Sequence, residues 1–571
     1  MGSPSDEKKM ITEPLLISRN PKGGFRTMPF ILANEAFERL ASIGLLQNMI
    51  LYLTREYNME MKVATNVLFI WSAVSDFLPI LGAIVADSYV GRYPVIGFGC
   101  ISSLLGMILL WFTAIFPPLK PPACDQVSNN NCESPSASQL LFLYSAFVLM
   151  SIGAGGIRSS SLAFGADQLD KGDKIKNAGL LQSYFSWYYA SVSASSMFAV
   201  TLVVYIQDNL GWKIGFGVPV VMMLLSALSF FLASPFYVKF KADTSLLTGL
   251  AQVIVASYKK RHINLSSQAT GEMYLSKKGS MFLMPTENLR CLNKACIIRH
   301  AEEDLTPDGR ASDPWSLCTV DQVEDLKAVI KVIPMWSTGI MIAVTISQQS
   351  FSVLQASSMD RHITPNFEIP SGSFGIFTII TLVIWIGLYD RIIIPIASKV
   401  KGKPCHLSLK QRMGIGLLLS VASMVAWAIV ESIRRKLAIK GGISDDPGAV
   451  AGMSAMCLIP HYVLGGLANA FNMIGQNEFY YSELPKSMSS IASTLHGLGL
   501  SVANLAASFI FNTVNDITKR GGKESWVANN INKGHYDYYL WLLAGLSLAN
   551  LTYYLACSKA YGPCKGDVRR Q

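Results

Sequence analysis

The sequence predicts an all-α membrane protein with 12 transmembrane helices in two six-helix bundles. Of its 571 residues, 51% are hydrophobic and only 15% are charged, whereas a soluble domain carries about 25% charged residues. A membrane-spanning helix needs roughly 20 mostly apolar residues, and such windows recur along the whole chain. Their order, six windows, a long polar stretch and six more windows, is typical of membrane proteins built from two repeated halves.

The apolar windows define the elements in order. In the first half they fall near residues 28–53, 64–86, 94–116, 139–164, 181–206 and 215–238. In the second half they fall near residues 330–355, 374–396, 412–433, 449–474, 489–513 and 537–560. The predicted organisation is a cytosolic tail over 1–26, an N-terminal bundle over 27–240, a cytosolic linker over 241–327, a C-terminal bundle over 328–561 and a cytosolic tail over 562–571.

Lys and Arg residues in the short loops predict this orientation, because cytosolic loops carry an excess of them. The basic residues of the loops after the fourth and eighth windows are Lys171, Lys174, Lys176, Arg391, Lys399, Lys401, Lys403, Lys410 and Arg412. Both termini and the linker are therefore expected in the cytosol. The stretch after the ninth window runs against this assignment, with Arg434, Arg435, Lys436 and Lys440 on the opposite side.

Several function classes find no support in the sequence. The net charge is +10, but its densest cluster, Lys259 to Arg261, has no run of aromatic residues beside it. No nucleic-acid partner is therefore expected, and these cations are expected to lie against membrane lipid. No nucleophile elbow, metal-ligand pattern or phosphate loop is present, which argues against an enzyme. Cys124 and Cys132 share a predicted outer loop and are candidates for a disulfide.

Charged residues inside the first window point to a site. Glu35, Glu38 and Arg39 lie at spacings that share one helical face. Each charge at the centre of a membrane helix costs about 2.5–3.5 kcal/mol, so we expect the three to face inward and partly neutralise one another. Intramembrane ionisable groups usually mark ion or substrate paths. The alternative is an ion pair that only fixes helix packing.

The fourth window offers a partner for these carboxylates. Its Gly153-Ala-Gly-Gly156 run lets helices approach closely and is followed by Arg158. Two carboxylates and two arginines in a low-dielectric pocket titrate as a coupled set. A proton on Glu35 or Glu38 would free an arginine to hold an anion, which gives a physical route to proton–anion coupling, with protons as the coupling ion and no other cofactor.

The second half carries polar faces instead of charges. Gln348, Ser352 and Gln355 recur along one face of the seventh window, and Asn469, Asn472 and Gln476 along one face of the tenth. Either set could form hydrogen bonds between helices or line a substrate path. The aromatic run that includes Tyr189, in the fifth window, fits an interfacial belt, with some rings available to a cavity.

Several motifs together resemble one family, the plant branch of the proton-dependent oligopeptide transporters, also called the nitrate transporter 1/peptide transporter family. Asp87-Ser-Tyr-Val-Gly91-Arg92 resembles the cytosolic gate signature of the major facilitator superfamily, and Phe164-Gly-Ala-Asp167-Gln-Leu-Asp170 resembles the family hallmark. Glu35-Ala-Phe-Glu38-Arg39 matches its proton-coupling motif in the first span. Further similar strings are Gly211–Pro219, Thr319–Lys327, Met359–Arg361, Tyr389–Arg391 and Gly475–Pro485.

The resemblance implies a major facilitator fold and proton symport by alternating access. It assigns proton coupling to Glu35, Glu38, Arg39 and Arg158, and the gate to Asp87 and Arg92. Substrate contacts are expected from Arg39, Arg158, Tyr189, Ser193, Thr345, Gln348, Ser352, Asn469 and Asn472. The resemblance also implies the plasma membrane, with the tonoplast as the alternative, and a monomer, with a dimer as the alternative.

Three departures from the family pattern bear on the substrate. Asn469 stands where a glutamate is common, Ser193 where asparagine is common, and Thr345 and Ile346 near where a nitrate carrier has a histidine. A zwitterionic peptide needs charges of both signs in the cavity, so these departures weaken that reading. The expected substrate is a small anion, such as nitrate, an organic anion or a plant hormone. The alternatives are a passive facilitator or exporter of hormones or glycosides, and a di- or tripeptide symporter.

Overall fold

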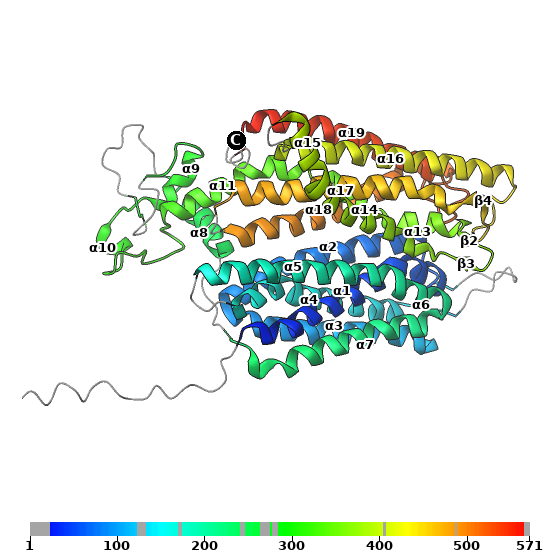
Figure 1. The fold of residues 1–571 in the computed structure, drawn as a ribbon, viewed down its shortest axis with the longest axis horizontal. Helices are drawn as coiled ribbons and strands as arrows, with labels where there is room; N and C mark the ends of the chain where they lie inside the picture. Colours follow the sequence, from blue (N-terminus) through cyan, green and yellow to red (C-terminus); the bar gives the residue numbers. More distant parts are fainter. Residues whose placement is uncertain are drawn as a thin grey trace, which may run out of the picture.

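The helices of the two halves form two bundles that lie side by side (Figure 1). The structure is a computed structural model that describes residues 23–122, 133–169, 174–239, 246–262, 274–276, 284–402, 407–485 and 488–564. The first bundle holds the helices up to α7 and the second those from α11 onward. The linker helices α8 to α10 lie together beyond one end of the bundles, the end at which the chain also finishes.

The N-terminal bundle contains the first six spans. Its helices are α1 (Met28–Leu51), α2 (Met61–Val85), α3 (Arg92–Ile115), α4 (Ala137–Leu169), α5 (Lys174–Phe198), α6 (Val204–Asn209) and α7 (Gly211–Leu232). A π-helical turn over Ala199–Val203 joins α5 to α6 in one continuous span. Gly91, which has a positive φ of 89°, ends the turn after α2 and begins α3, because an L side chain is disfavoured in that conformation.

The C-terminal bundle contains the other six spans. Its helices are α11 (Val320–Ser337), α12 (Ile340–Ser347), α13 (Gln349–Ser357), α14 (Ile376–Leu388), α15 (Ile394–Lys401), α16 (Leu409–Lys440), α17 (Ile459–Glu483), α18 (Ser489–Thr518) and α19 (Tyr536–Tyr561). Capping boxes start two of them: the Thr319 and Ser408 side chains accept hydrogen bonds from the third residue of α11 and α16. The seventh span is broken, with a bend of 50° between α11 and α12.

The structure confirms a fold with many membrane-spanning helices. Nine helices among the described residues are long and apolar enough to cross a membrane, and the bent α11–α13 segment passes as a tenth span. The remaining two spans, α1 and α17, have 24 and 25 residues, enough to cross a hydrocarbon core of about 30 Å. They are less apolar because α1 carries charges and α17 carries many polar residues. The tenth span begins at Ile459, later than its predicted window, because strand β4 precedes it.

Short strands lie at the end far from the linker. Strand β1 (Met359–Asp360) pairs in parallel with β4 (Ala451–Ser454), and β2 (His362–Thr364) pairs antiparallel with β3 (Phe367–Glu368). At this end Arg361 lies 3.6 Å from Asp208 of α6, which joins the two halves by an ion pair. Closer to the middle, Ser501 of α18 donates to the backbone oxygen of Ala73 in α2 (2.9 Å). The halves thus meet along α2 and α18 and at the far end.

Glycines allow α4 to pack closely against its neighbours, as the sequence suggested. A Cβ atom at Gly156 would lie 2.6 Å from the Val95 backbone oxygen of α3, and one at Gly153 would lie 2.4 Å from the Ser103 Cβ. Both distances are shorter than real Cβ contacts, so a larger residue would force the helices apart. This close packing fixes the position of Arg158 one turn further along α4.

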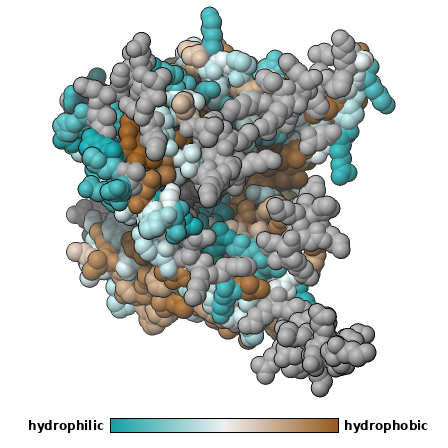
Figure 2. Space-filling view, turned by 90° about the vertical axis from the view of Figure 1, so that its left-hand side faces the viewer, coloured by the Kyte–Doolittle hydropathy of each residue, from teal (hydrophilic) through white to brown (hydrophobic). Residues whose placement is uncertain are grey.

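The linker has a small core of its own, which the sequence analysis did not anticipate. Its helices are α8 (Leu246–Lys259), α9 (Arg290–Asn293) and α10 (Ala301–Asp304). The buried apolar side chains of this core are Val253, Ala256, Ala295, Cys296, Cys318, Val320, Val323 and Leu326. Helix α8 begins this core, and its buried side chains pack on the first turns of α11. Seen from the linker end, the surface of the protein carries hydrophilic residues with hydrophobic patches between them (Figure 2).

The basic stretch after the ninth span is not a loop. Helix α16 continues to Lys440, and Arg434 is fully buried within the protein, where it pairs with Glu431 at 2.8 Å. Arg435 donates to the backbone oxygen of Gly534 (2.8 Å). Two of the four cations that contradict the orientation are therefore satisfied inside the fold, and they carry little weight in a rule that concerns loop charges.

Candidate functional site

The centre of the site is the Glu38 carboxylate of α1. It is completely buried and accepts hydrogen bonds from Ser42 Oγ (2.6 Å) and from Arg158 Nη2 (3.1 Å) at the same oxygen. Arg158 Nε reaches the other oxygen at 3.4 Å, and Arg39 Nε lies 4.0 Å from it. Since every contact is a donor or a cation, this environment stabilises the ionised form of Glu38.

Glu35, one turn earlier on α1, has a less complete environment. Its Oε1 accepts a hydrogen bond from Arg39 Nε at 3.0 Å. Its Oε2 is buried, and no donor among the described residues meets hydrogen-bond geometry there. Tyr188 of α5 lies close enough to interact electrostatically with both Glu35 and Arg39. The predicted i, i+3 and i+4 face of α1 thus carries two carboxylates, each held by a different arginine.

A cavity of about 220 Å³ lies next to this cluster, between the two halves. Its lining residues are Ser42, Leu46 and Gln47 of α1, Leu68, Phe69, Trp71, Ser72, Ser75 and Asp76 of α2, Met150, Ala154 and Arg158 of α4, Ile346 and Ser347 of α12, Gln349 and Ser350 of α13, and Leu500 and Asn504 of α18. Arg158 is the member of the coupling cluster that lines it, and Glu38 holds Arg158 from the other side.

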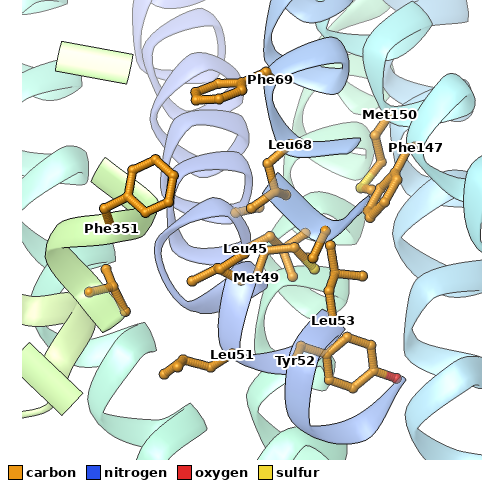
Figure 3. Close-up of a cluster of buried hydrophobic side chains, with 14 of the residues drawn as sticks. Leu45, Met49, Leu51, Tyr52, Leu53, Leu68, Phe69, Phe147, Met150 and Phe351 are labelled. Carbon is orange, nitrogen blue, oxygen red and sulfur yellow. The ribbon is translucent and has the colours of Figure 1, made fainter. Parts of the chain in front are cut away.

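Apolar side chains form part of the cavity wall, beside its polar lining residues. Figure 3 shows Leu68 and Phe69 of α2 and Met150 of α4 in a buried cluster with residues of α1 and with Phe351 of α13. Such walls lower the local dielectric, which strengthens the attraction between Arg158 and any anion that reaches it. A cavity with an apolar wall and a few charged groups is the usual form of a binding site for a small molecule.

Asp76 of α2 lines the cavity and was missed by the sequence analysis. Its Oδ2 accepts a hydrogen bond from Asn504 Nδ2 of α18 at 3.2 Å, and it interacts electrostatically with Arg158 and Arg39. The signal was available, because Asp76 is an ionisable residue inside the second apolar window, the same feature that identified Glu35 and Glu38. The cavity therefore contains charges of both signs.

The predicted substrate residues of the C-terminal half do not line this cavity. Gln348 is buried and accepts a hydrogen bond from the Tyr539 hydroxyl (3.0 Å), and Ser352 Oγ bonds the Tyr462 hydroxyl. Thr345 Oγ1 donates to the Ile342 backbone oxygen, and Asn472 Nδ2 donates to that of Met413. The side chains of these four residues therefore make interhelical or local hydrogen bonds instead of lining a substrate path. Asn469 is half-buried on α17.

Polar residues next to the predicted ones take their place at the cavity. Gln349 and Ser350 of α13 line it where Gln348 and Ser352 were expected, because Gln349 and Ser350 share one face of the helix with Ile346, whereas Gln348 and Ser352 lie on another face. Gln349 also hydrogen-bonds Gln47 of α1, which links the two halves.

The remaining predicted residues lie elsewhere. Tyr189 is exposed and Ser193 half-buried on α5, outside the lining of the cavity. Asp87 and Arg92, the predicted gate, pair with each other at 3.1 Å, and Arg92 also contacts Asp167 at 2.5 Å. The two family motifs at the linker end are thus joined by one arginine. Cys124 and Cys132 lie outside the described residues.

Comparisons with known proteins agree with the arrangement. A family model described as the POT family matches residues 93–527. Protein NRT1/ PTR FAMILY 1.2 of Arabidopsis thaliana is 55% identical, over 96% of this chain and 92% of that protein. Protein NRT1/ PTR FAMILY 1.1 of the same plant is 52% identical, over 100% of this chain and 97% of that protein. The crystal structure of the POT family transporter PepTSo has a similar fold, with a TM-score of 0.66 at 18% identity, covering 95% of this chain and 99% of that one.

Proposed function

The chain belongs to the POT/NRT1-PTR family of proton-coupled transporters, and from this premise we propose that it imports a small anionic solute together with protons. Nitrate and organic anions, including plant hormones, are the candidate solutes. Membership of a transporter family and the many apolar helices make it a multi-pass membrane protein. We propose that it acts as a monomer in the plasma membrane, with the linker and both tails in the cytosol.

One observation carries the proposal. Arg158 lines the cavity between the halves while its guanidinium is bound to Glu38 at 3.1 Å. An anion in the cavity and the ionised Glu38 compete for the same cation. Protonation of Glu38 removes one competitor, so that proton binding and anion binding favour each other. This mutual preference is what couples two ligands in a symporter.

Glu35 plays a different part in this scheme. It holds Arg39 at 3.0 Å, and Arg39 does not line the cavity. A proton on Glu35 would therefore release an arginine behind the binding site, whereas a proton on Glu38 would release the one that faces the solute. We assign the coupling proton to Glu38 and a supporting role to Glu35 and Arg39.

The size of the cavity supports a small solute. Pockets for drug-sized ligands have volumes of about 300–1,000 Å³, and this cavity has about 220 Å³. Nitrate or a small organic anion fits this volume better than a large hormone or a glycoside. The cavity also holds a carboxylate, Asp76, together with Arg158, and this pair of opposite charges favours a second candidate, a small zwitterion such as a dipeptide.

Uptake measurements test the proposal. Cells that express the chain would be given nitrate, a dipeptide, abscisic acid, gibberellin or a glucoside at acidic and at neutral pH, with and without a protonophore. We expect an anion to accumulate above its equilibrium ratio at acidic pH and to lose this accumulation with the protonophore. Accumulation that persists with the protonophore would overturn proton symport, and uptake that only equilibrates would indicate a passive facilitator.

A further inference from the structure

Asp76 adds a third carboxylate to the coupling cluster and places it inside the cavity. It lies on α2, and its side chain lines the cavity together with Arg158 of α4 and Asn504 of α18. Asn504 donates a hydrogen bond to Asp76 Oδ2 (3.2 Å). Asp76 therefore stands where the two halves meet, in contact with both the solute space and the opposite bundle.

The charged groups around Asp76 can be named from each neighbouring helix. Arg158 faces it from α4 and Arg39 from α1, and both interact with it electrostatically. From α18 its contact is the uncharged Asn504, while His496 lies about two turns earlier on that helix. The two arginines are also the partners of Glu35 and Glu38. Three carboxylates thus share two guanidinium groups.

The charge balance of this cluster constrains the transport reaction. With all five groups ionised, the cluster has one negative charge in excess, and a monovalent anion in the cavity raises the excess to two. Uncompensated charge is strongly disfavoured in a low-dielectric site. Protonation of Glu38 alone leaves one charge uncompensated while the anion is bound. A second proton is needed to reach neutrality, and Asp76 is the carboxylate that faces the anion.

We propose that Asp76 is a second proton-carrying residue of the transport cycle, so that a monovalent anion enters with two protons. This inference rests on the proposed proton–anion symport. Protonated Asp76 no longer competes with the solute for Arg158, and it can still accept the hydrogen bond from Asn504. The cycle then moves one net positive charge inward for each anion, since two protons and one anion cross together.

A flux experiment measures this charge directly. In voltage-clamped cells, the inward current and the uptake of labelled nitrate would be recorded together. We expect one net charge per nitrate for the unaltered chain and no net charge for Asp76→Asn, which retains only the Glu38 proton. Asp308→Asn, which removes an exposed carboxylate of the linker, serves as the matched control and should keep one charge per nitrate. An unchanged ratio in Asp76→Asn would overturn the proposal.

A second measurement is independent of the solute. Infrared difference spectra of the full-length protein in lipid, taken between neutral and acidic pH, report protonated carboxyl groups by their carbonyl stretch. We expect Asp76→Asn to lack one band that Asp308→Asn retains, and Asp76→Glu to restore a shifted band. If the Asp76→Asn spectrum keeps every band, Asp76 does not take a proton and the inference is wrong.

The two measurements separate this inference from the proposed function. If the unaltered chain accumulates no nitrate while the infrared band depends on Asp76, the choice of nitrate fails and the second proton site stands. If nitrate accumulates with a charge ratio that Asp76→Asn does not alter, symport stands and the second proton site fails. Complete loss of nitrate binding in Asp76→Asn, with no change in Asp76→Glu, would show that Asp76 binds the solute itself and would contradict its role as a proton carrier.

Discussion

Two glutamate–arginine pairs with a buried carboxylate, Glu38–Arg158 and Glu431–Arg434, differ in how they are built. Glu38 and Arg158 come from different helices, and the arginine side chain is 17% exposed toward the cavity. Glu431 and Arg434 are three residues apart on α16, and the arginine is 0% exposed. Both pairs bury a carboxylate almost completely. The difference lies in what else the arginine can bind.

Arg434 has a closed set of partners. Its Nε and Nη2 donate to the two oxygens of Glu431, both at 2.8 Å, its Nη1 donates to Asn532 Oδ1 at 2.5 Å, and its Nη2 also donates to the Ile531 backbone oxygen. Arg158 has Glu38 on one side, and the open cavity with Asp76 on the other. Burial of the pair alone therefore does not mark a transport site. An arginine that can exchange its carboxylate partner for a solute does.

The largest expected effect is on stability and concerns Glu431 and Arg434, which we call the closed pair. Arg434→Met leaves Glu431 as a buried charge without its partner, which typically costs about 3–5 kcal/mol. We expect a strong loss of thermal stability in detergent and of protein at the membrane. The double variant Glu431→Leu/Arg434→Met removes both charges and should recover most of the stability. If the single variant is as stable as the unaltered chain, the closed pair has no structural role.

Glu38 and Arg158, which we call the exchangeable pair, should respond in the opposite way, with a loss of function and little change in stability. Glu38→Gln keeps a hydrogen-bonding side chain beside Ser42 and Arg158 but can no longer take up a proton. We expect the protein to reach the membrane with nearly unchanged thermal stability. Its uptake should lose pH dependence, and accumulation should fall to the passive ratio. Retained pH-dependent uptake would contradict the role of Glu38 and would make the two pairs functionally alike.

A smaller effect is expected from the partner that completes the closed pair. Asn532→Ala removes the hydrogen bond at 2.5 Å to the Arg434 guanidinium, and hydrogen bonds to charged groups contribute about 1.5–3 kcal/mol. We expect a stability loss within that range and an unchanged pH dependence of uptake per folded molecule. A change in the pH profile would show that the closed pair communicates with the cavity, and the comparison would then fail.

The sequence predicted the exchangeable pair better than the closed one. A charged residue inside an apolar window is easily recognised, so the pairing of Glu38 with Arg158 could be predicted from the sequence. Arg434 follows directly after the predicted window, which ends at residue 433, so the sequence placed it in a loop. In the structure, helix α16 extends to Lys440 and includes it. Asp76 carried the same signal as Glu38, an ionisable residue inside an apolar window, and was overlooked.

The wall of the C-terminal half could not be predicted from the sequence. Two faces of the α12–α13 segment carry polar residues, and Gln349 on one face lines the cavity while Gln348 on the other bonds Tyr539. No local signal shows which of the two polar faces turns toward the cavity. The apolar core of the linker was also missed, because its residues are brought together from three separate segments of a polar stretch.

The linker gives the smallest test, because burial outweighs the nearby Lys260 and keeps two of its cysteine thiols protonated. Burial raises the pKa of the Cys296 thiol to about 12 and that of Cys318 to about 11, against about 8.5 for a free cysteine. The thiolate is the reactive form, so at neutral pH both thiols should react with iodoacetamide roughly a hundredfold or more slowly than the exposed Cys291. Mass spectrometry of each cysteine would measure this, with the urea-unfolded chain as the control in which all three react alike. Equal labelling of Cys291 and Cys296 in the folded protein would mean that the linker core opens readily. Burial of a thiol would then be no guide to local rigidity in the linker. The contrast between Arg434 and Arg158 would apply only to the membrane-spanning bundles.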